Sequence, residues 1–246
     1  MIITVDETSS TNTLLKEMNA PHGTAVMAIR QTAGRGQRGN TWESEPGKNV
    51  TLSIILRPES LPAADQFVIS MIVAVATARL VSDYLKIAQE DKKVTVKWPN
   101  DIYVGEKKIS GILIENAISS GAVASSIIGI GLNVNQVKFL SDAPNPISLA
   151  NITGCEYDVS EVAERLVEKI LNLYDETILA GKIPELEQTY RSLLYRRTGI
   201  YQWREAETGR VFKAEIHGID PFGRLMLKED LKATPTAYAF KEVVYL

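Results

Sequence analysis

The feature that most constrains the fold of this chain is a long apolar stretch near residue 70. Residues 67–81 are interrupted only by Ser70, Thr77 and Arg79, and the stretch falls short of the roughly 20 apolar residues that span a bilayer. An almost continuous apolar face over residues 63–85 predicts a long helix buried against a sheet. We therefore expect a core helix rather than a membrane anchor.

Several β-rich segments surround this helix, with turn residues between them. They are residues 2–5, 23–30, 49–56, 94–97, 102–104, 108–115 and 123–134. Further helices are expected after the cap-rich residues 8–11, over residues 160–180 with Ser160 as the cap, and over residues 184–195 with Pro184 at the start. The pattern predicts an α+β fold in which a mixed, largely antiparallel sheet packs on helices.

The pattern changes after Gly199. Short strands are expected at residues 201–203, 211–216, 225–227 and 239–245. We predict a large domain over residues 1–198 and a small all-β domain over residues 199–246, which needs to dock on the large domain to be stable.

Composition excludes several classes of protein. The chain has 246 residues, 45% of them hydrophobic and 23% charged, which is incompatible with disorder or a fibrous repeat. A net charge of -3 predicts no general affinity for nucleic acid. Cys155 is the only cysteine, so a disulfide within the chain and a cysteine-based zinc site are excluded, and His22 and His217 are not expected to act in catalysis. The N-terminus lacks the pattern of a signal peptide, so we expect a cytoplasmic protein without membrane partners.

Residues 31–48 form a polar, glycine-rich segment between two predicted strands. Residues 34–39 match G-x-G-x-x-G, but no helical pattern follows, which argues against a dinucleotide-binding loop. The glycine backbone, with Arg35 and Arg38, suits a phosphate or carboxylate. A solvated loop is the alternative, and Trp42 argues against it because an indole is a good cover for an aromatic ligand.

A second polar cluster surrounds Lys108. Strand alternation predicts that Lys108 shares a face with Ser110, Ile112 and Ile114, an otherwise apolar face. Either the lysine lies at the strand end and reaches water, or it is held in a site for an anion. The pattern alone leaves both interpretations open.

Five sequence blocks resemble a known family in their order and spacing. They are Ser10-Thr11-Asn12, residues 31–42 (QTAGRGQRGNTW), 97–101 (KWPND), 108–115 (KISGILIE) and 129–135 (GIGLNVN). Together they resemble the biotin protein ligases, also called biotin–[acetyl-CoA-carboxylase] ligases, over essentially the whole chain. The resemblance implies the class II synthetase-like fold of biotin and lipoyl ligases, with a small C-terminal SH3-like β-barrel. It also implies a two-step reaction: biotin and ATP give biotinyl-5'-AMP, and a lysine of a biotin carboxyl carrier domain then takes the biotinyl group.

The resemblance also implies roles for individual residues. Those expected to bind biotin are Ser10, Thr11, Asn12, Gln31, Gly34, Arg35, Gly36, Gln37, Lys108 and Gly111. Those expected to bind ATP or the adenylate are Arg35, Arg38, Trp42, Asn100, Lys108 and Asn133. Trp42 would cover the adenine when its loop closes and so limit escape of the adenylate. Lys108 and Arg35 are the expected catalytic residues, because joining a carboxylate to an α-phosphate requires positive charge.

Asp101 is the candidate ligand for Mg²⁺, which prefers carboxylate oxygens near phosphates. The alternative is an aspartate that caps the turn after Pro99-Asn100. The sequence departs from the family at Gln37 and Asn40, where many members carry arginine, so a side-chain electrostatic role at position 37 is in doubt.

Three other functions compete with the ligase. A lipoate or octanoate ligase or transferase has a related fold, but its Arg-Arg and triple-glycine loop is absent. A repressor requires a DNA-reading domain, and the sequence begins at the first strand of the catalytic domain, so we expect the monofunctional type without nucleic acid as a partner. A binding module that has lost catalysis would not need both Lys108 and Arg35. The sequence leaves the oligomeric state open, with a homodimer among the options.

Overall fold

A seven-stranded sheet forms the centre of the computed structural model, which describes residues 1–36, 41–58, 61–140, 145–230 and 234–246. Its order is β1-β2-β3-β7-β6-β5-β4. The strands are β1 (Ile2–Thr8), β2 (Ala25–Gln31), β3 (Val50–Leu56), β4 (Val94–Lys97), β5 (Asp101–Val104), β6 (Lys107–Ser119) and β7 (Ala122–Leu132). β1 and β2 are parallel, and every other neighbouring pair is antiparallel. The predicted mixed, largely antiparallel sheet is confirmed.

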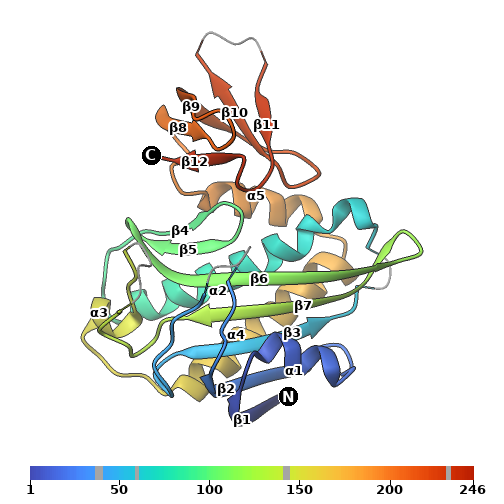
Figure 1. Cartoon of the computed structure of the whole chain (residues 1–246), viewed down its shortest axis with the longest axis vertical. Helices are drawn as coiled ribbons and strands as arrows, with labels where there is room; N and C mark the ends of the chain where they lie inside the picture. Colours follow the sequence, from blue (N-terminus) through green and yellow to red (C-terminus); the bar gives the residue numbers. More distant parts are fainter. Residues whose placement is uncertain (37–40, 59–60, 141–144, 231–233) are drawn as a thin grey trace.

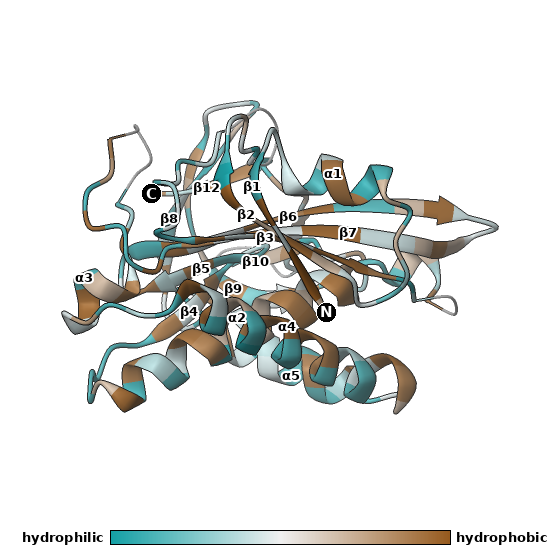
Figure 2. Cartoon of the chain, turned by 90° about the horizontal axis from the view of Figure 1, so that it is seen from below, coloured by the Kyte–Doolittle hydropathy of each residue, from teal (hydrophilic) through white to brown (hydrophobic). Residues whose placement is uncertain are grey.

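Helices cover the two faces of this sheet unequally. The helices are α1 (Thr11–Glu17), α2 (Phe67–Ile87), α3 (Leu149–Thr153), α4 (Val159–Tyr174) and α5 (Ile183–Leu193), with a 3-10 turn at Ala63–Asp65 and a π turn at Asp175–Leu179. In Figure 2, α2, α4 and α5 lie on one side of the sheet and α1 lies on the other. The face beside α1 is therefore only partly covered by helix, and it holds the site described below.

Helix α2 is the predicted core helix. Its length and composition would suffice to cross a membrane, but 78% of its most apolar window is buried inside the protein. Ile69, Ile72, Val73 and Ala74 have no exposed surface. The helix is apolar because it packs between the sheet and α4 and α5, as its sequence predicts.

Two details of the helices differ from the sequence prediction. The cap of α4 is Asp158, whose carboxylate accepts hydrogen bonds from the backbone N–H groups of Ser160 and Glu161, so Ser160 lies within the helix and does not cap it. α5 begins as predicted with a proline in its first turn, but it ends at Leu193 because Leu194 is extended and the Tyr195 N–H donates to the Val96 carbonyl of β4.

A β-bulge in β6 corrects the predicted orientation of Lys108. Tyr103 of β5 pairs with Lys108 and Ile102 pairs with Ser110, so Ile109 is an extra residue in β6. Ile109 is fully buried, whereas the Lys108 side chain lies 3.2 Å from the position of a Cβ on Gly111. Lys108 therefore shares the face of Gly111, not the apolar face of Ile112. Strict alternation of side chains fails here because the extra residue, Ile109, moves Lys108 to the opposite face of the strand.

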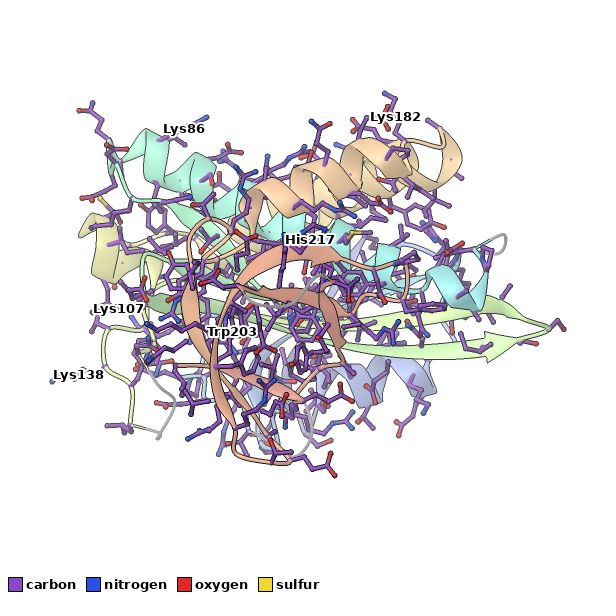
Figure 3. All side chains as sticks on the ribbon, turned by 90° about the horizontal axis from the view of Figure 1, so that it is seen from above. Lys86, Lys107, Lys138, Lys182, Trp203 and His217 are labelled. Carbon is purple, nitrogen blue, oxygen red and sulfur yellow. The ribbon has the colours of Figure 1, made fainter. Side chains whose placement is uncertain are left out.

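The C-terminal residues form a five-stranded antiparallel sheet in the order β11-β10-β9-β8-β12. The strands are β8 (Tyr201–Glu205), β9 (Val211–Ile219), β10 (Leu225–Glu229), β11 (Thr236–Tyr238) and β12 (Val243–Tyr245). The predicted last strand over residues 239–245 is confirmed only at residues 243–245, because residues 240–242 form a turn with Lys241 at φ 70°. Figure 3 looks onto this sheet, with Trp203 and His217 labelled. Trp203 is fully buried, whereas His217 is exposed on β9.

The small sheet docks on the end of the large one that carries β4 and α5 (Figure 1). The Trp98 indole N–H donates to the Gly223 carbonyl at 2.9 Å, and the Trp98 ring packs edge-on against Phe240. Arg191 of α5 donates to the Ile219 carbonyl at 3.1 Å. These contacts bring C-terminal aromatic residues beside the sequence block at residues 97–101.

Candidate active site

A cavity of about 780 Å³ lies on the open face of the large sheet. Most of the residues predicted from the sequence line it, although they come from separate segments of the chain. They are Ser10, Thr11, Asn12, Gln31, Arg35, Gly36, Trp42, Asn100, Asp101, Lys108, Gly111 and Asn133. Gly34 does not line the cavity. It lies behind Trp42, whose carbonyl would be 2.8 Å from a Cβ at this position. Gln37, Arg38 and Asn40 lie outside the described residues.

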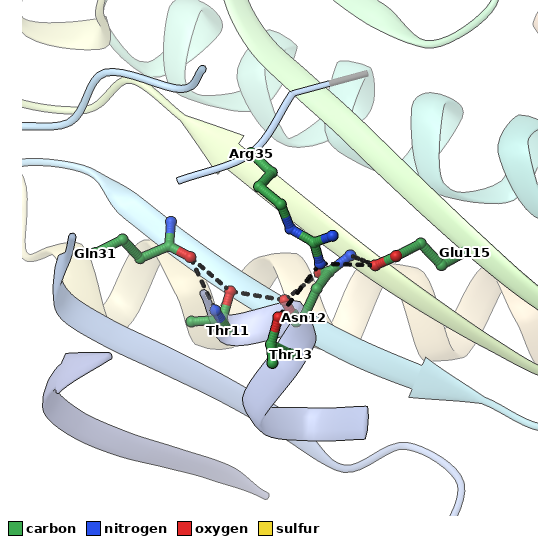
Figure 4. Close-up of polar contacts among 7 residues, drawn as sticks. Thr11, Asn12, Thr13, Gln31, Arg35 and Glu115 are labelled. Atoms are coloured by element: carbon green, nitrogen blue, oxygen red, sulfur yellow. Dashed lines mark hydrogen bonds and ion pairs between the residues drawn. The ribbon is translucent and has the colours of Figure 1, made fainter. Parts of the chain in front are cut away.

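A closed hydrogen-bond network forms the end of the cavity beside α1 (Figure 4). The Thr11 N–H and hydroxyl both donate to Gln31 Oε1, at 2.9 and 3.2 Å. Ser53 Oγ of β3 lies 2.7 Å from Thr11 Oγ1 and 2.5 Å from Asn12 Oδ1. Asn12 Nδ2 donates to Glu115 Oε2 at 2.7 Å. These contacts fix the orientation of the Asn12 amide, so this end is organised by the protein alone.

Ser10 precedes the network at the start of α1. Its backbone occupies the N-cap position of α1, as the cap-rich sequence predicts, but its side chain makes no capping hydrogen bond. The residue is 6% exposed and lines the cavity. Ser10 therefore contributes to the wall of the cavity and does not cap the helix with its side chain.

Arg35 lies on the rim, where the loop leaves β2. Its Nη2 is 3.3 Å from Glu115 Oε2 and 3.4 Å from Thr13 Oγ1 (Figure 4). The arms of the loop meet through a bridge between Arg35 and Thr41 and through the Trp42 N–H, which donates to the Gly34 carbonyl at 3.0 Å. Glu115 thus holds both a cavity-lining amide and a cavity-lining cation.

Lys108 lies in the middle of the cavity. Its Nζ is 2.7 Å from Asp101 Oδ2, and both side chains are about a third exposed or less, at 28% and 33%. Asp101, the candidate Mg²⁺ ligand, is thus the ion-pair partner of Lys108. Within the described parts of the chain, no group of three or more His, Cys, Asp or Glu side chains could hold a metal ion. Among the described residues Asp101 thus belongs to no cluster of three ligating side chains, which suits an ion that also binds phosphates.

Trp42 lies flat on two glycines of the sheet. A Cβ at Gly131 would be 2.2 Å from Trp42 Cε2, and a Cβ at Gly111 would be 2.9 Å from Trp42 Cζ3. Only glycine leaves room for the indole at these positions. The Trp42 Nε1 atom is buried with no hydrogen-bond partner in the described structure.

Asn133 follows β7 at the same end. Its Nδ2 donates to the Ile147 carbonyl at 3.0 Å, whereas its Oδ1 is buried without a donor in the described part of the protein. A buried acceptor without a partner costs about 1–3 kcal/mol. This end of the cavity thus contains polar atoms that a ligand could satisfy.

Sequence reasoning assigned no role to four residues that build the site. Ser53 and Glu115 complete the network around Asn12. Gly129 leaves room for Asn12, whose Oδ1 would be 2.4 Å from a Cβ at this position. Lys97 lines the cavity at the end near the C-terminal sheet. A usable signal was the alternation in β7, where Gly129 and Gly131 interleave with the buried Ile128 and Ile130.

Comparison with known proteins agrees with this geometry. A sequence model of the biotin/lipoate A/B protein ligase family matches residues 4–133. The bifunctional ligase/repressor BirA of Bacillus subtilis is 35% identical over 232 residues, which cover 91% of this chain and 68% of that protein. The biotin–[acetyl-CoA-carboxylase] ligase of Paracoccus denitrificans is 31% identical over 240 residues, which cover 90% of this chain and 91% of that protein.

The fold is shared with solved structures. The biotin protein ligase of Aquifex aeolicus in complex with biotin and ATP superposes with a TM-score of 0.77 and 26% identity, over 99% of this chain and 97% of that one. The α+β fold with a second antiparallel sheet at the C-terminus, which fits an SH3-like domain, is thereby confirmed. The chain belongs to the biotin/lipoate A/B protein ligase family.

Proposed function

We propose that this chain is an ATP-dependent ligase that activates biotin as biotinyl-5'-AMP and transfers it to a lysine of a biotin carboxyl carrier domain. The observation that carries the proposal is the joining, in one cavity, of a polar network beside α1, the Lys108–Asp101 pair, and the Trp42–Asn133 surface. The solved relative that holds biotin and ATP supports the same pair of ligands.

The network beside α1 suits the ureido ring of biotin, which both donates and accepts hydrogen bonds. Ser10, Thr11, Asn12 and Gln31 present hydroxyl and amide groups there. Leu113, on the same face of β6 as Gly111, also lines the cavity, and we assign its apolar side chain to the hydrocarbon parts of biotin. The ring would thus bind to a surface that is already organised, which lowers the entropic cost of binding.

Trp42 and Asn133 form the surface that we assign to adenine. The indole offers an aromatic face, and the unpaired Asn133 Oδ1 can accept a hydrogen bond from the exocyclic amine. Asn100 would contact the nucleotide from the turn after β4. Closure of the loop over residues 31–48 would limit escape of the adenylate, so adenylate should leak faster from a Trp42→Ala variant than from the wild type.

In the first step, a biotin carboxylate oxygen attacks the α-phosphorus of ATP, the bond to the bridging oxygen breaks, and pyrophosphate leaves. Lys108 and Arg35 would stabilise the negative charge that accumulates there. In the second step, the amine of the carrier lysine attacks the acyl carbon, AMP leaves with the electron pair, and the amine loses a proton. Gly36, which lines the cavity, would allow close approach of the anionic groups, whereas Gly34 and Gly111 leave room for Trp42. Gln37 and Arg38 are assigned to contacts of the same loop with the anionic groups.

Mg²⁺ would enter this site with the phosphates of ATP. Asp101 beside Asn100 fits as one protein ligand, because Mg²⁺ is usually held by one or two carboxylates together with substrate phosphates. The ion would supply charge neutralisation at the phosphates.

We further propose residues 1–198 as the catalytic domain, residues 199–246 as the SH3-like domain, and the cytoplasm as the location.

One experiment tests the assignment. The protein is incubated with ATP, Mg²⁺ and either biotin or lipoate, with and without a carrier domain, while pyrophosphate release and acyl transfer are followed. We expect pyrophosphate release with biotin and transfer to the carrier lysine. Release with lipoate but not with biotin would favour the alternative, a lipoate or octanoate ligase or transferase, and would overturn the proposal.

A further inference from the structure

Lys97 occupies an unusual position at the end of β4. It lines the cavity, and its Nζ lies 5.0 Å from the centroid of the Tyr103 ring and 4.9 Å from that of the Tyr245 ring. The Tyr195 ring is 6.0 Å away, and Tyr103 Oη is 3.4 Å away. Tyr103 comes from β5, Tyr195 follows α5, and Tyr245 belongs to β12 of the C-terminal sheet. We call these three rings the tyrosine cage.

The cage holds the lysine without neutralising its charge. Burial raises the pKa values of Tyr103 and Tyr245, so both rings stay neutral at physiological pH. Neutral rings attract an ammonium group through their electron-rich faces. Burial lowers the pKa of Lys97, and the nearby Asp101 carboxylate opposes that shift. An anion in the cavity would therefore gain more from Lys97 than from a cation that is already paired.

The cations that line the cavity differ in whether a carboxylate pairs with them. In the described structure they are Arg35, Lys97 and Lys108. Arg35 contacts Glu115 and Lys108 contacts Asp101, whereas no described carboxylate lies within 4.0 Å of Lys97 Nζ. Of these three cations, Lys97 is thus the one whose positive charge is not paired with a described carboxylate.

The C-terminal sheet fixes one wall of the cage. Tyr245 pairs with Trp203 in the ladder between β12 and β8, and the two ring centroids are 4.4 Å apart. The Arg196 guanidinium donates to the Leu246 carbonyl at 2.6 Å, which fastens the strand to the large domain. Phe240, in the turn between β11 and β12, also lines the cavity. The sequence prediction placed every site residue within residues 1–198, whereas the cavity extends onto the C-terminal sheet.

We propose that Lys97 binds the β- and γ-phosphates of the nucleoside triphosphate and stabilises the departing pyrophosphate, and that Tyr245 is its positioning residue. This inference rests on the proposed function. The polar network beside α1 and the Trp42–Asn133 surface are assigned to biotin and adenine, and Lys97 lies at a further end of the same cavity. When the bond between the α-phosphorus and the bridging oxygen breaks, the electron pair goes to pyrophosphate, where a fixed cation is most effective.

The test separates the two half-reactions. In Lys97→Met, pyrophosphate release from ATP and biotin should fall about 10²-fold, whereas transfer from added biotinyl-5'-AMP to the carrier domain should stay within about twofold of the wild type. Lys107→Met is the matched control, because Lys107 is a neighbouring lysine that is exposed and does not line the cavity. It should change neither rate. An unchanged release rate in Lys97→Met, or an equal loss of both half-reactions, would overturn the assignment.

The role of Tyr245 is tested by variants that remove or keep its aromatic ring. Tyr245→Leu should raise the KM for ATP about tenfold and leave transfer from biotinyl-5'-AMP unchanged, whereas Tyr245→Phe, which keeps the ring, should restore the wild-type KM. A purely structural role would lower the thermal midpoint and reduce both half-reactions together, and that result would overturn the positioning role.

Direct binding keeps this inference distinct from the proposed function. Titration calorimetry of the intact chain with pyrophosphate and Mg²⁺ should show binding to the wild type and to Lys107→Met, and at least tenfold weaker binding to Lys97→Met. If the wild type did not adenylate biotin, the proposed function would fail, while this titration would still decide the role of Lys97. Equal binding by all three proteins would refute it.

Discussion

The two ends of the cavity differ in how far the protein itself satisfies their polar groups. Beside α1, Thr11, Asn12, Ser53 and Glu115 contact one another in a continuous network. At the other end, Trp42 Nε1 and Asn133 Oδ1 have no partner in the described structure. The first end is organised before a ligand binds, whereas the second contains polar atoms that a ligand could satisfy.

The two ends differ because one is built from residues on packed helices and strands and the other includes a residue from a loop. The network beside α1 joins residues on packed elements, and Asn12 is only 3% exposed. Trp42 comes from the loop after β2 and rests on glycines of the sheet. A side chain on a packed element can be fixed by its neighbours, whereas a loop side chain can be displaced without disturbing the core.

The largest expected effect is at Lys108, where the two ends meet. Lys108→Ala should lower the rate of pyrophosphate release about 10²–10³-fold, because it removes a cation from the developing charge. The free energy of unfolding should change by less than about 1 kcal/mol, because the ion pair with Asp101 is partly exposed. Pyrophosphate assays and thermal melts check both statements. An unstable but active variant would show that Lys108 acts in packing.

Two glycines on β7 allow the ends to be disturbed separately. Gly129→Ala should weaken biotin binding about tenfold, because its Cβ would overlap Asn12 Oδ1, and Gly131→Ala should weaken ATP binding by a similar factor, because its Cβ would overlap the Trp42 ring. Each variant serves as the control for the other in titration calorimetry. Only Gly129→Ala should also lower the thermal midpoint, since Asn12 is buried. Equal loss of both ligands in either variant would contradict the separation of the ends.

A Glu115 variant tests whether biotin binding beside α1 requires every polar group of the network to have a hydrogen-bond partner. Glu115→Ala leaves the Asn12 amide without its acceptor, so biotin affinity should fall about fivefold. The control is Glu7→Ala, which removes an exposed ion pair with Arg30 on β1 and β2. Calorimetric titration with biotin should separate the two variants. If both bound biotin equally well, the network would not be needed for that end.

The smallest expected effect is the pH dependence of stability at Lys97. Burial lowers the pKa of this lysine below its ordinary 10.5, so the folded protein binds fewer protons there than the unfolded chain. The resulting destabilisation is fully present below the folded pKa and is relieved as the pH rises towards 10.5. The wild type should therefore gain stability relative to Lys97→Met over that range in urea unfolding experiments. A difference that is constant with pH would show that Lys97 is not desolvated.

Much of the site could be predicted because its residues lie in compact sequence blocks with unusual chemistry. The glycines near Arg35, the position of Trp42 after them, and the block around Asn100 and Asp101 all line the cavity or support it, as expected. Glycine and tryptophan in a polar segment have few structural reasons to occur there, so their chemistry is informative without knowledge of the fold.

The errors have a common cause. The face of Lys108 was predicted wrongly because alternation assumes a regular strand, and the bulge at Ile109 depends on pairing with β5. The last strand begins later than predicted because of a turn at Lys241, and the α4 cap lies at Asp158 rather than at Ser160. In each case neighbouring residues could have formed the feature equally well by sequence, and the contacts in the folded protein decide between them.

The sequence by itself determined the fold class and the buried helix over residues 63–85, because these follow from periodicity. The residues that meet in the cavity were expected from the resemblance of five sequence blocks to the biotin protein ligases. Only the tertiary structure decided the partners: Glu115 for Asn12, Asp101 for Lys108, and the tyrosine cage for Lys97. Such partners lie on different strands, in the case of Tyr245 on a different sheet, and pairing between distant segments is set by packing and register rather than by local sequence.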